Sequence, residues 1–221
     1  MKPLILKHVT ICLAGGKAPL IKDLDLTVEP GEVVTIMGRS GIGKSTLLAF
    51  IGGHLDGAFE ANGQVLIGEE DLTARAPEKR RIGLLFQDDL LFPHLSVGDN
   101  LAFGLVRHVK GKAERQGRVE EALERAGLSG FANRDPATLS GGQRARVALM
   151  RTLLAEPMAL LLDEPFSKLD NGLRDDVRQF VFAHAREEGL PVLMVTHDEG
   201  DAVAAGGRVI KLAASLNPAA V

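Results

Sequence analysis

A glycine-rich segment near the N-terminus has the residue types and spacing of a phosphate-binding loop. Residues 38–45, GRSGIGKS, match G-x-x-x-x-G-K-[ST], follow the apolar run "GEVVTIMG" and open a helical pattern. The glycines allow consecutive backbone N–H groups to converge on a β-phosphate, and Lys44 places a positive charge against the β- and γ-phosphates. The Ser45 hydroxyl can ligate Mg²⁺. We expect the nucleotide to contact Gly38, Ser40, Gly41, Gly43, Lys44, Ser45 and Thr46.

Two acidic residues close a later apolar run. Asp163 and Glu164 end "MALLLDE" and precede Pro165. The carboxyl ends of parallel strands face the ligand crevice of an α/β sheet. Asp163 is therefore placed to hold Mg²⁺ through water, and Glu164 to orient or deprotonate an attacking water. Taken alone, the two acids could instead cap a helix near Pro165, but beside a phosphate loop the catalytic interpretation is favoured.

Two further polar residues end apolar runs. Gln87 follows "IGLLF" and His197 follows "VLMVT". A strand-end glutamine is commonly solvated, and a single histidine is commonly structural. At the same edge of the crevice, however, Gln87 could sense the γ-phosphate through Mg²⁺ or water. His197 could donate a hydrogen bond to the γ-phosphate or position the water.

The order of the predicted elements indicates an α/β fold. Short apolar strands alternate with helical patterns, which predicts a mostly parallel sheet with helices on both faces. The first two runs, LILKHVTICL and IKDLDLTV, alternate in polarity and predict an antiparallel β portion at the N-terminus. From Ser96 to Leu154 the pattern changes, and three stretches have helical periodicity: "VGDNLAFGLVRHV" (residues 97–109), "RQGRVEEALERAGL" and "GGQRARVALMRTLLAE". We interpret residues 96–154 as a helical subdomain inserted between the core segments 1–95 and 155–221 of a single domain.

Composition narrows the class of protein. The chain has 221 residues, a net charge of −3 and a single cysteine, Cys12, which excludes an internal disulfide. The slight negative charge argues against nucleic acid as a partner. No apolar run reaches the length of about 18 residues that a membrane helix needs. Lys7 and His8 interrupt the apolar start of the chain, so we do not interpret it as a signal peptide.

Besides the phosphate loop, the sequence contains a second helix start that suits a phosphate, and its role needs an explanation. In "LSGGQRARVALMR", Ser140, Gly141 and Gly142 should free N–H groups at the head of a helix, which suits an anion, but no lysine accompanies them. The phosphate loop, Gln87, "LSGGQ", "LLLDEP", "SKLD" and His197 occur in the order seen in ATP-binding-cassette (ABC) ATPases. The chain resembles this family from Leu4 to Leu212.

The resemblance implies an explanation for the second helix start. Two ABC subunits pair head to tail, and each ATP lies between the phosphate loop of one subunit and the "LSGGQ" helix of the other. Ser140, Gly141, Gly142 and Gln143 would then serve the nucleotide of the partner subunit, and Asp170 in "SKLD" would contact across the same interface. The cofactors implied are ATP and Mg²⁺, with Ser45, Gln87 and Asp163 around the metal.

Within the family, the segment "FQDDLLFPHLSVGDNLAFGL" is similar to the ATPase subunits of bacterial importers for thiamine, iron, sulfate and molybdate. This likeness implies a peripheral protein on the cytoplasmic face of the bacterial membrane, with a permease bound near residues 88–97 and, indirectly, a solute-binding protein. Leu90, Leu91, Phe92 and Leu95 form an apolar cluster there. They could contact the permease, or could simply pack the helical subdomain.

Three features depart from the family pattern. The aromatic residue that normally stacks on adenine is replaced by Leu13, and the chain has no Trp or Tyr. Lys168 stands in the "SKLD" loop where a small residue is common. Because the sequence runs only to Val221, we expect it to lack the regulatory β-domain that many importer ATPases carry. The alternatives are an ABC exporter subunit, a soluble ABC protein without a transport role, and a non-catalytic binding module; intact Glu164 and His197 disfavour the last.

Overall fold

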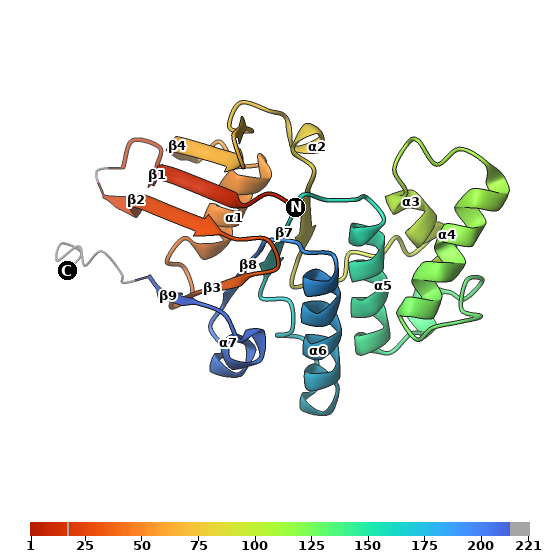
Figure 1. The fold of residues 1–221 in the computed structure, drawn as a ribbon. Helices are drawn as coiled ribbons and strands as arrows, with labels where there is room; N and C mark the ends of the chain where they lie inside the picture. Colours follow the sequence, from red (N-terminus) through yellow and green to blue (C-terminus); the bar gives the residue numbers. More distant parts are fainter. Residues whose placement is uncertain (17, 213–221) are drawn as a thin grey trace.

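A five-stranded parallel sheet forms the centre of the protein. The computed structural model describes residues 1–16 and 18–212 (Figure 1). The sheet has the order β6-β7-β8-β3-β9, and the register of every neighbouring pair is parallel. Its strands are β3 (Val33–Met37), β6 (Ile82–Leu85), β7 (Ala159–Asp163), β8 (Val192–Thr196) and β9 (Val209–Lys211). The central strands are buried on both faces, which explains why they read as continuous apolar runs.

A second, antiparallel sheet covers one face of the first. Its order is β2-β1-β4-β5. The strands are β1 (Leu4–Leu13), β2 (Pro19–Val28), β4 (Phe59–Ile67) and β5 (Glu70–Asp71). Helix α1 (Lys44–Gly52) shares one hydrophobic cluster with both sheets. The expected antiparallel portion is confirmed, but on this face a sheet, together with α1, provides the cover that was expected from helices alone.

Helices cover the opposite face of the parallel sheet. They are α6 (Asn171–Glu187) and α7 (Glu199–Ala205), with part of α5 (Gly141–Leu153) (Figure 1). Phe182 of α6 meets Phe166 edge to face, with 5.7 Å between ring centroids, in a second hydrophobic cluster. Residues of β7 and β8 belong to the same cluster, so this helical layer supports both strands.

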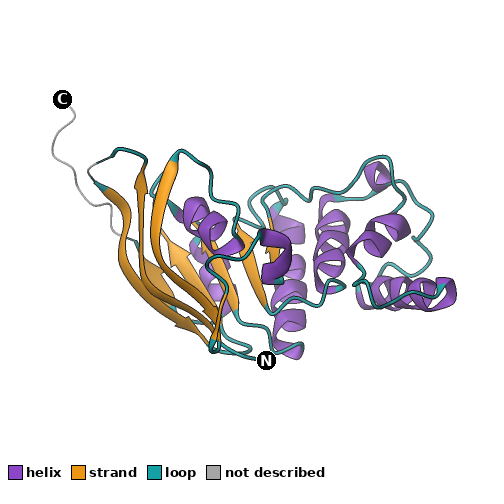
Figure 2. Ribbon diagram, turned by 90° about the horizontal axis from the view of Figure 1, so that it is seen from above, coloured by secondary structure: helices purple, strands orange, loops and turns teal. Residues whose placement is uncertain are grey.

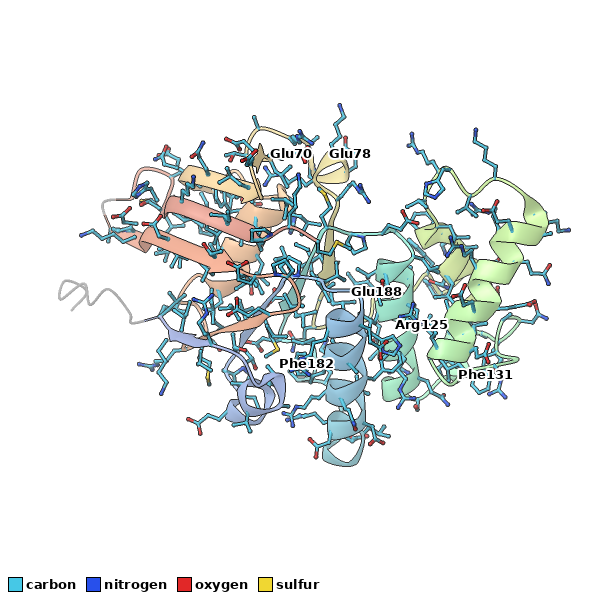
Figure 3. The ribbon with its side chains drawn as sticks, viewed as in Figure 1. Glu70, Glu78, Arg125, Phe131, Phe182 and Glu188 are labelled. Carbon is cyan, nitrogen blue, oxygen red and sulfur yellow. The ribbon has the colours of Figure 1, made fainter. Side chains whose placement is uncertain are left out.

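A group of helices extends from one side of the core (Figure 2). It consists of α3 (Val97–Gly104), α4 (Lys112–Arg125), the 3-10 helix η1 (Pro136–Thr138) and α5, and it has a hydrophobic cluster of its own. Helix α5 joins the two parts, because Val147 and Met150 pack into the helical cluster while Leu149 packs into the core. Arg125 at the end of α4 also donates to Glu188 beyond α6, at 2.8 Å (Figure 3).

Some boundaries differ from the sequence prediction. The helix expected over residues 97–109 ends at Gly104, where a Cβ would lie 2.2 Å from the carbonyl oxygen of Arg151. A one-turn helix, α2 (Pro77–Arg80), precedes β6. The last strand among the described residues is β9, and the stretch 213–221 of the predicted core lies outside them. Among the described residues, no helix is both long and apolar enough to cross a membrane.

Strand β4 begins four residues earlier than its sequence pattern indicates. The run "GQVLIG" predicts a strand from Gly63, but β4 starts at Phe59. A bulge interrupts its pairing with β1 between Lys7 and Thr10. Gly63 sits there at φ 108°, and a Cβ on it would lie 2.7 Å from the carbonyl oxygens of Lys7 and His8. The extra length brings Phe59 directly opposite Leu13, the last residue of β1.

Candidate functional site

A cleft of about 590 Å³ opens where β3 and β7 end and α1 begins. It gathers residues from the phosphate loop, from the segment after β6 and from the end of β7. The lining residues are Leu13, Leu20, Ser40, Gly41, Gly43, Lys44, Ser45, Thr46, Phe59, Gln87, Asp163 and Glu164. Nine of the sequence-predicted residues, Ser40 to Thr46 without Ile42 together with Gln87, Asp163 and Glu164, therefore line one cavity. This is the crevice expected at the carboxyl ends of parallel strands.

The loop before α1 is shaped by glycines. Gly41 and Gly43 adopt φ values of 80° and 101°, which disfavour any residue with a β-carbon. The Lys44 side chain is 5% exposed, and its ammonium donates to the carbonyl oxygens of Gly38 at 2.7 Å and Arg39 at 3.2 Å. The loop thus curls around a positive charge, next to N–H groups at the start of a helix. That combination binds phosphate.

A hydroxyl and a carboxylate meet across the cleft. The Ser45 hydroxyl donates to Oδ1 of Asp163 at 2.9 Å, although the two residues are 118 positions apart. Burial raises the pKa of Asp163 above its usual value, and the charge of Glu164 adds to this, while the Ser45 hydrogen bond and Lys44 oppose it. Hard oxygen donors on a half-buried site suit Mg²⁺, which would satisfy the carboxylate that burial destabilises. The residues present therefore fit a Mg²⁺ ion held between Ser45 and Asp163.

Glu164 lies between the phosphate loop and the end of β8. Its Oε1 is 3.9 Å from Nζ of Lys44 and its Oε2 is 3.1 Å from Nδ1 of His197. The backbone of Glu164 is left-handed, with φ 46°, and its N–H donates to the carbonyl of Val195 at 2.9 Å. Such a conformation in a non-glycine residue is uncommon and is held here by the sheet. The carboxylate is one-fifth exposed, so a water molecule can reach it.

A buried network holds the turn that carries His197. The Thr196 hydroxyl donates to Oδ2 of Asp201 at 2.7 Å and accepts from the N–H of Asp198 at 3.1 Å. Arg178 of α6 donates from Nε to Oδ1 of Asp201 at 2.7 Å and from Nη2 to Asp198 at 3.1 Å. Asp201 is 2% exposed. Asp201 was not predicted from the sequence, because its partner Arg178 lies on a helix that is distant in the chain.

Asp201→Ala should lower the free energy of unfolding by about 3–5 kcal/mol, because it leaves the Arg178 guanidinium buried without its nearest countercharge. Urea unfolding measures the effect. Asp175→Ala is the matched control: Asp175 also pairs with Arg178, at 2.9 Å, but is 85% exposed, so its loss should change stability little. Equal losses in the two variants would contradict a role for burial.

The second predicted phosphate-facing element does not line this cleft. Ser140 caps α5 and forms a capping box with Gln143, in which Ser140 N–H donates to Gln143 Oε1 at 2.9 Å. A Cβ at Gly141 would lie 3.4 Å from Leu169, next to Asp170 at the start of α6. Ser140 is therefore exposed beside the "SKLD" loop and Gly141 is partly exposed there, whereas Gly142 is buried against α6. The cleft of this chain and this surface do not meet within one copy.

The residues after Gln87 contact both of these surface elements. Asp88 forms an ion pair with Lys168 of the "SKLD" loop. Asp89 accepts from Nε of Arg144 in α5, at 2.9 Å. The unusual Lys168 thus has a partner in the segment that follows β6. Residues 87–89 thus connect the cleft to the "SKLD" loop and to the start of α5.

Comparison with known proteins identifies the family. Residues 21–167 match the family model described as ABC transporter. The chain is 49% identical over 210 residues to an ABC transporter ATP-binding protein of Escherichia coli strain K12, YnjD, covering 95% of each. The chain belongs to the ABC transporter ATP-binding family. It has the ABC ATPase fold that its motifs predict.

Other relatives extend the comparison. The Fe(3+) import ATP-binding protein FbpC 1 of Haemophilus influenzae is 44% identical over 207 residues, and the chain spans 62% of its length. The dimeric structure of MJ0796, a bacterial ABC transporter cassette, matches with a TM-score of 0.77 and 35% identity, covering 95% of this chain and 94% of that one. A second structure of MJ0796, bound to ADP and Pi, has a TM-score of 0.78. The chain therefore belongs among ATP-hydrolysing ABC proteins.

The apolar wall of the cleft was partly missed by the sequence analysis. Leu13 does line the cleft, where the family position for the base-contacting aromatic predicts it, and its side chain is 50% exposed. Leu20 and Phe59 line it as well and were not expected there. Phe59 lies opposite Leu13 because β4 starts earlier than the sequence pattern predicts. The cleft of this ABC ATPase therefore does contain an aromatic ring, but the ring comes from β4 and not from the end of β1.

Proposed function

We propose that this chain is the ATPase subunit of a bacterial solute importer, bound to the cytoplasmic face of the membrane. The observation that carries the proposal is the arrangement of Glu164 between Lys44 and His197, at the end of a cleft with a complete phosphate loop. Relatives named as Fe(3+) import proteins support the direction of transport. We also propose that residues 96–154 are a subdomain inserted into a single ABC ATPase domain formed by residues 1–95 and 155–221.

The geometry suggests a role for each cleft residue. Loop N–H groups and Lys44 bind the β- and γ-phosphates of ATP. Ser45, Asp163 and Gln87 would hold Mg²⁺, which would supply charge neutralisation at the phosphates. Glu164 is placed to take the proton of the attacking water, because its carboxylate is within reach of solvent and of the phosphate side of the cleft. His197, 3.1 Å from Glu164, positions that water or donates to the γ-phosphate.

The elements outside the cleft point to a second copy of the chain. The exposed Ser140 caps a 13-residue helix that begins with Gly141, Gly142 and Gln143, next to Asp170. A helix start that faces the γ-phosphate of the partner would complete each cleft and exclude water from it. ATP then favours the closed dimer, and hydrolysis removes the group that bridges the two copies. The dimeric MJ0796 structure supports this arrangement.

Permease contact is proposed for the segment at residues 88–97 and the adjoining helix α3. Leu90 is 55% exposed and Phe103 is 68% exposed, and a groove between them is lined by Phe92 and Arg151. The apolar cluster expected here is only partly exposed, since Leu91 packs against both the core and the helical cluster. The rings of Phe92 and Phe103 meet at 4.6 Å between centroids. A solute-binding protein outside the membrane would act through the permease.

The importer proposal is tested by co-purification with membrane proteins. A tagged chain should recover a polytopic permease from detergent-solubilised membranes. Leu90→Asp and Phe103→Asp should each reduce that recovery about tenfold or more, because a carboxylate would be buried in an apolar contact. Val203→Asp is the matched control, since Val203 is 79% exposed on α7, and should leave recovery unchanged.

The same preparations separate docking from folding. Leu90→Asp and Phe103→Asp should bind ATP and melt as the unaltered chain does, because both side chains are mostly exposed. Phe92→Asp is a more disruptive variant because that ring is half-buried. Full permease recovery with both exposed positions changed would reject this surface as the contact.

A further inference from the structure

One end of the cleft is apolar. Leu13, Leu20 and Phe59 line it, while the phosphate loop, Gln87, Asp163 and Glu164 line the rest. Leu20 borders the loop directly, because a Cβ on Gly43 would lie 3.2 Å from Cβ of Leu20. A nucleotide has the same division into a charged phosphate end and a flat, apolar-faced base. The lining of the cleft thus offers both kinds of surface that a nucleotide needs.

We propose that Phe59 is the residue on which the nucleotide base stacks, an assignment that rests on the proposed function as an ATPase. Among the described residues that line the cleft, Phe59 is the one with an aromatic side chain. Cross-strand partners share a face of the sheet, so Phe59 and Leu13 both border the space beside the loop. A phenyl ring offers a π-face that Leu13 and Leu20 lack.

The position of Phe59 is firmly held. Its ring is half-buried and packs in part against the core cluster that contains both sheets. Its N–H donates to the carbonyl of Asp56 at 3.0 Å, and the preceding carbonyl of Ala58 accepts from Ala14 at 2.8 Å. A ring fixed before binding loses little freedom when a base covers it. Leu13, which is 50% exposed, would close over one side of the base as an apolar contact.

Discrimination between bases should be weak at this end of the cleft. The side chains of Leu13, Leu20 and Phe59 carry no hydrogen-bonding atoms, and every base has a π-face. ATP and GTP should consequently bind with similar affinity. Tripolyphosphate, which lacks the base and sugar, should bind more weakly than ATP and should be indifferent to changes at Phe59.

The first test is a titration of ATP and tripolyphosphate, each with Mg²⁺, against variants of the full chain. Phe59→Leu keeps an apolar side chain of similar packing and should weaken ATP binding at least about fivefold, and Phe59→Ala by about 5- to 150-fold. Neither should alter tripolyphosphate binding. Leu13→Ala is the matched control from the opposite strand and should weaken ATP less than Phe59→Leu does.

The second test uses the composition of the chain. Because the sequence contains no Trp or Tyr, Phe59→Trp creates a protein whose indole emission comes from position 59 alone. ATP should change that emission and tripolyphosphate should not. Phe103→Trp, at a residue 68% exposed on α3, is the control and should respond to neither.

The outcomes distinguish the two proposals. If the unaltered chain binds neither ATP nor tripolyphosphate, the proposed function fails and the assignment of Phe59 falls with it. If the chain binds both, but Phe59→Leu binds ATP as tightly as before, only the assignment of Phe59 is overturned. An equal response of Phe59→Trp to ATP and tripolyphosphate would overturn it as well.

Discussion

Glu164→Gln should bind Mg-ATP but hydrolyse it about 10²- to 10⁴-fold more slowly, the range that a general base contributes. The amide keeps the size of the carboxylate but is a far weaker proton acceptor. Affinity should not fall, because the change removes a negative charge 3.9 Å from Lys44, beside the site proposed for the phosphates. With hydrolysis blocked, the closed ATP-bound dimer should accumulate.

Phosphate release and sedimentation with Mg-ATP measure the two effects. Glu199→Gln, an exposed glutamate in the first turn of α7, is the control and should hydrolyse ATP normally and relax to monomers. A Glu164→Gln protein that stays monomeric at saturating Mg-ATP would refute the closed-dimer mechanism. Unchanged turnover would remove Glu164 from the chemistry.

Mixing Ser140→Arg and Lys44→Ala subunits should restore activity that neither protein has alone. Arginine at the start of α5 blocks the opposite loop by size and charge, and loss of Lys44 removes the charge that faces the phosphates. In a mixed dimer, Lys44 of one chain meets Ser140 of the other, which rebuilds one site of two. Random pairing makes half of the dimers mixed, so recovery of about a quarter of normal ATPase activity is expected for independent sites.

Tags of two kinds allow the mixed dimers to be isolated and counted. Mixing two differently tagged Lys44→Ala preparations is the control and should recover nothing. Absence of activity in verified mixed dimers would contradict independent composite sites. Recovery would show that each site takes residues from both chains, as the separation of Ser140 from the cleft requires.

The sequence was sufficient to predict those parts of the site that depend on local pattern. The phosphate loop has a fixed spacing, and Asp163 ends an apolar run, so the parallel sheet brings them together through the Ser45–Asp163 hydrogen bond. The same reasoning placed Gln87 at the cleft. These predictions succeeded because strand ends meet at one edge of a parallel sheet whatever the details of packing.

Other features depend on contacts between distant residues and left no local pattern. The first half of β4 contains the polar residues Glu60 and Asn62 and then Gly63, so no apolar run marked its early start or the position of Phe59. The pairing of Asp88 with Lys168 joins loops 80 residues apart. Neither residue type predicts a partner at that distance, because surface charges are usually solvated.

The backbone of Glu164 has a consequence for protein engineering. A left-handed conformation costs a residue with a β-carbon roughly 1–2 kcal/mol relative to what glycine would incur. Glu164 adopts φ 46°, so a redesign guided only by thermostability would favour glycine at this position. It would thereby discard the carboxylate to which we assign the chemistry. Stabilisation campaigns on this chain should hold position 164 fixed and look for improvements elsewhere.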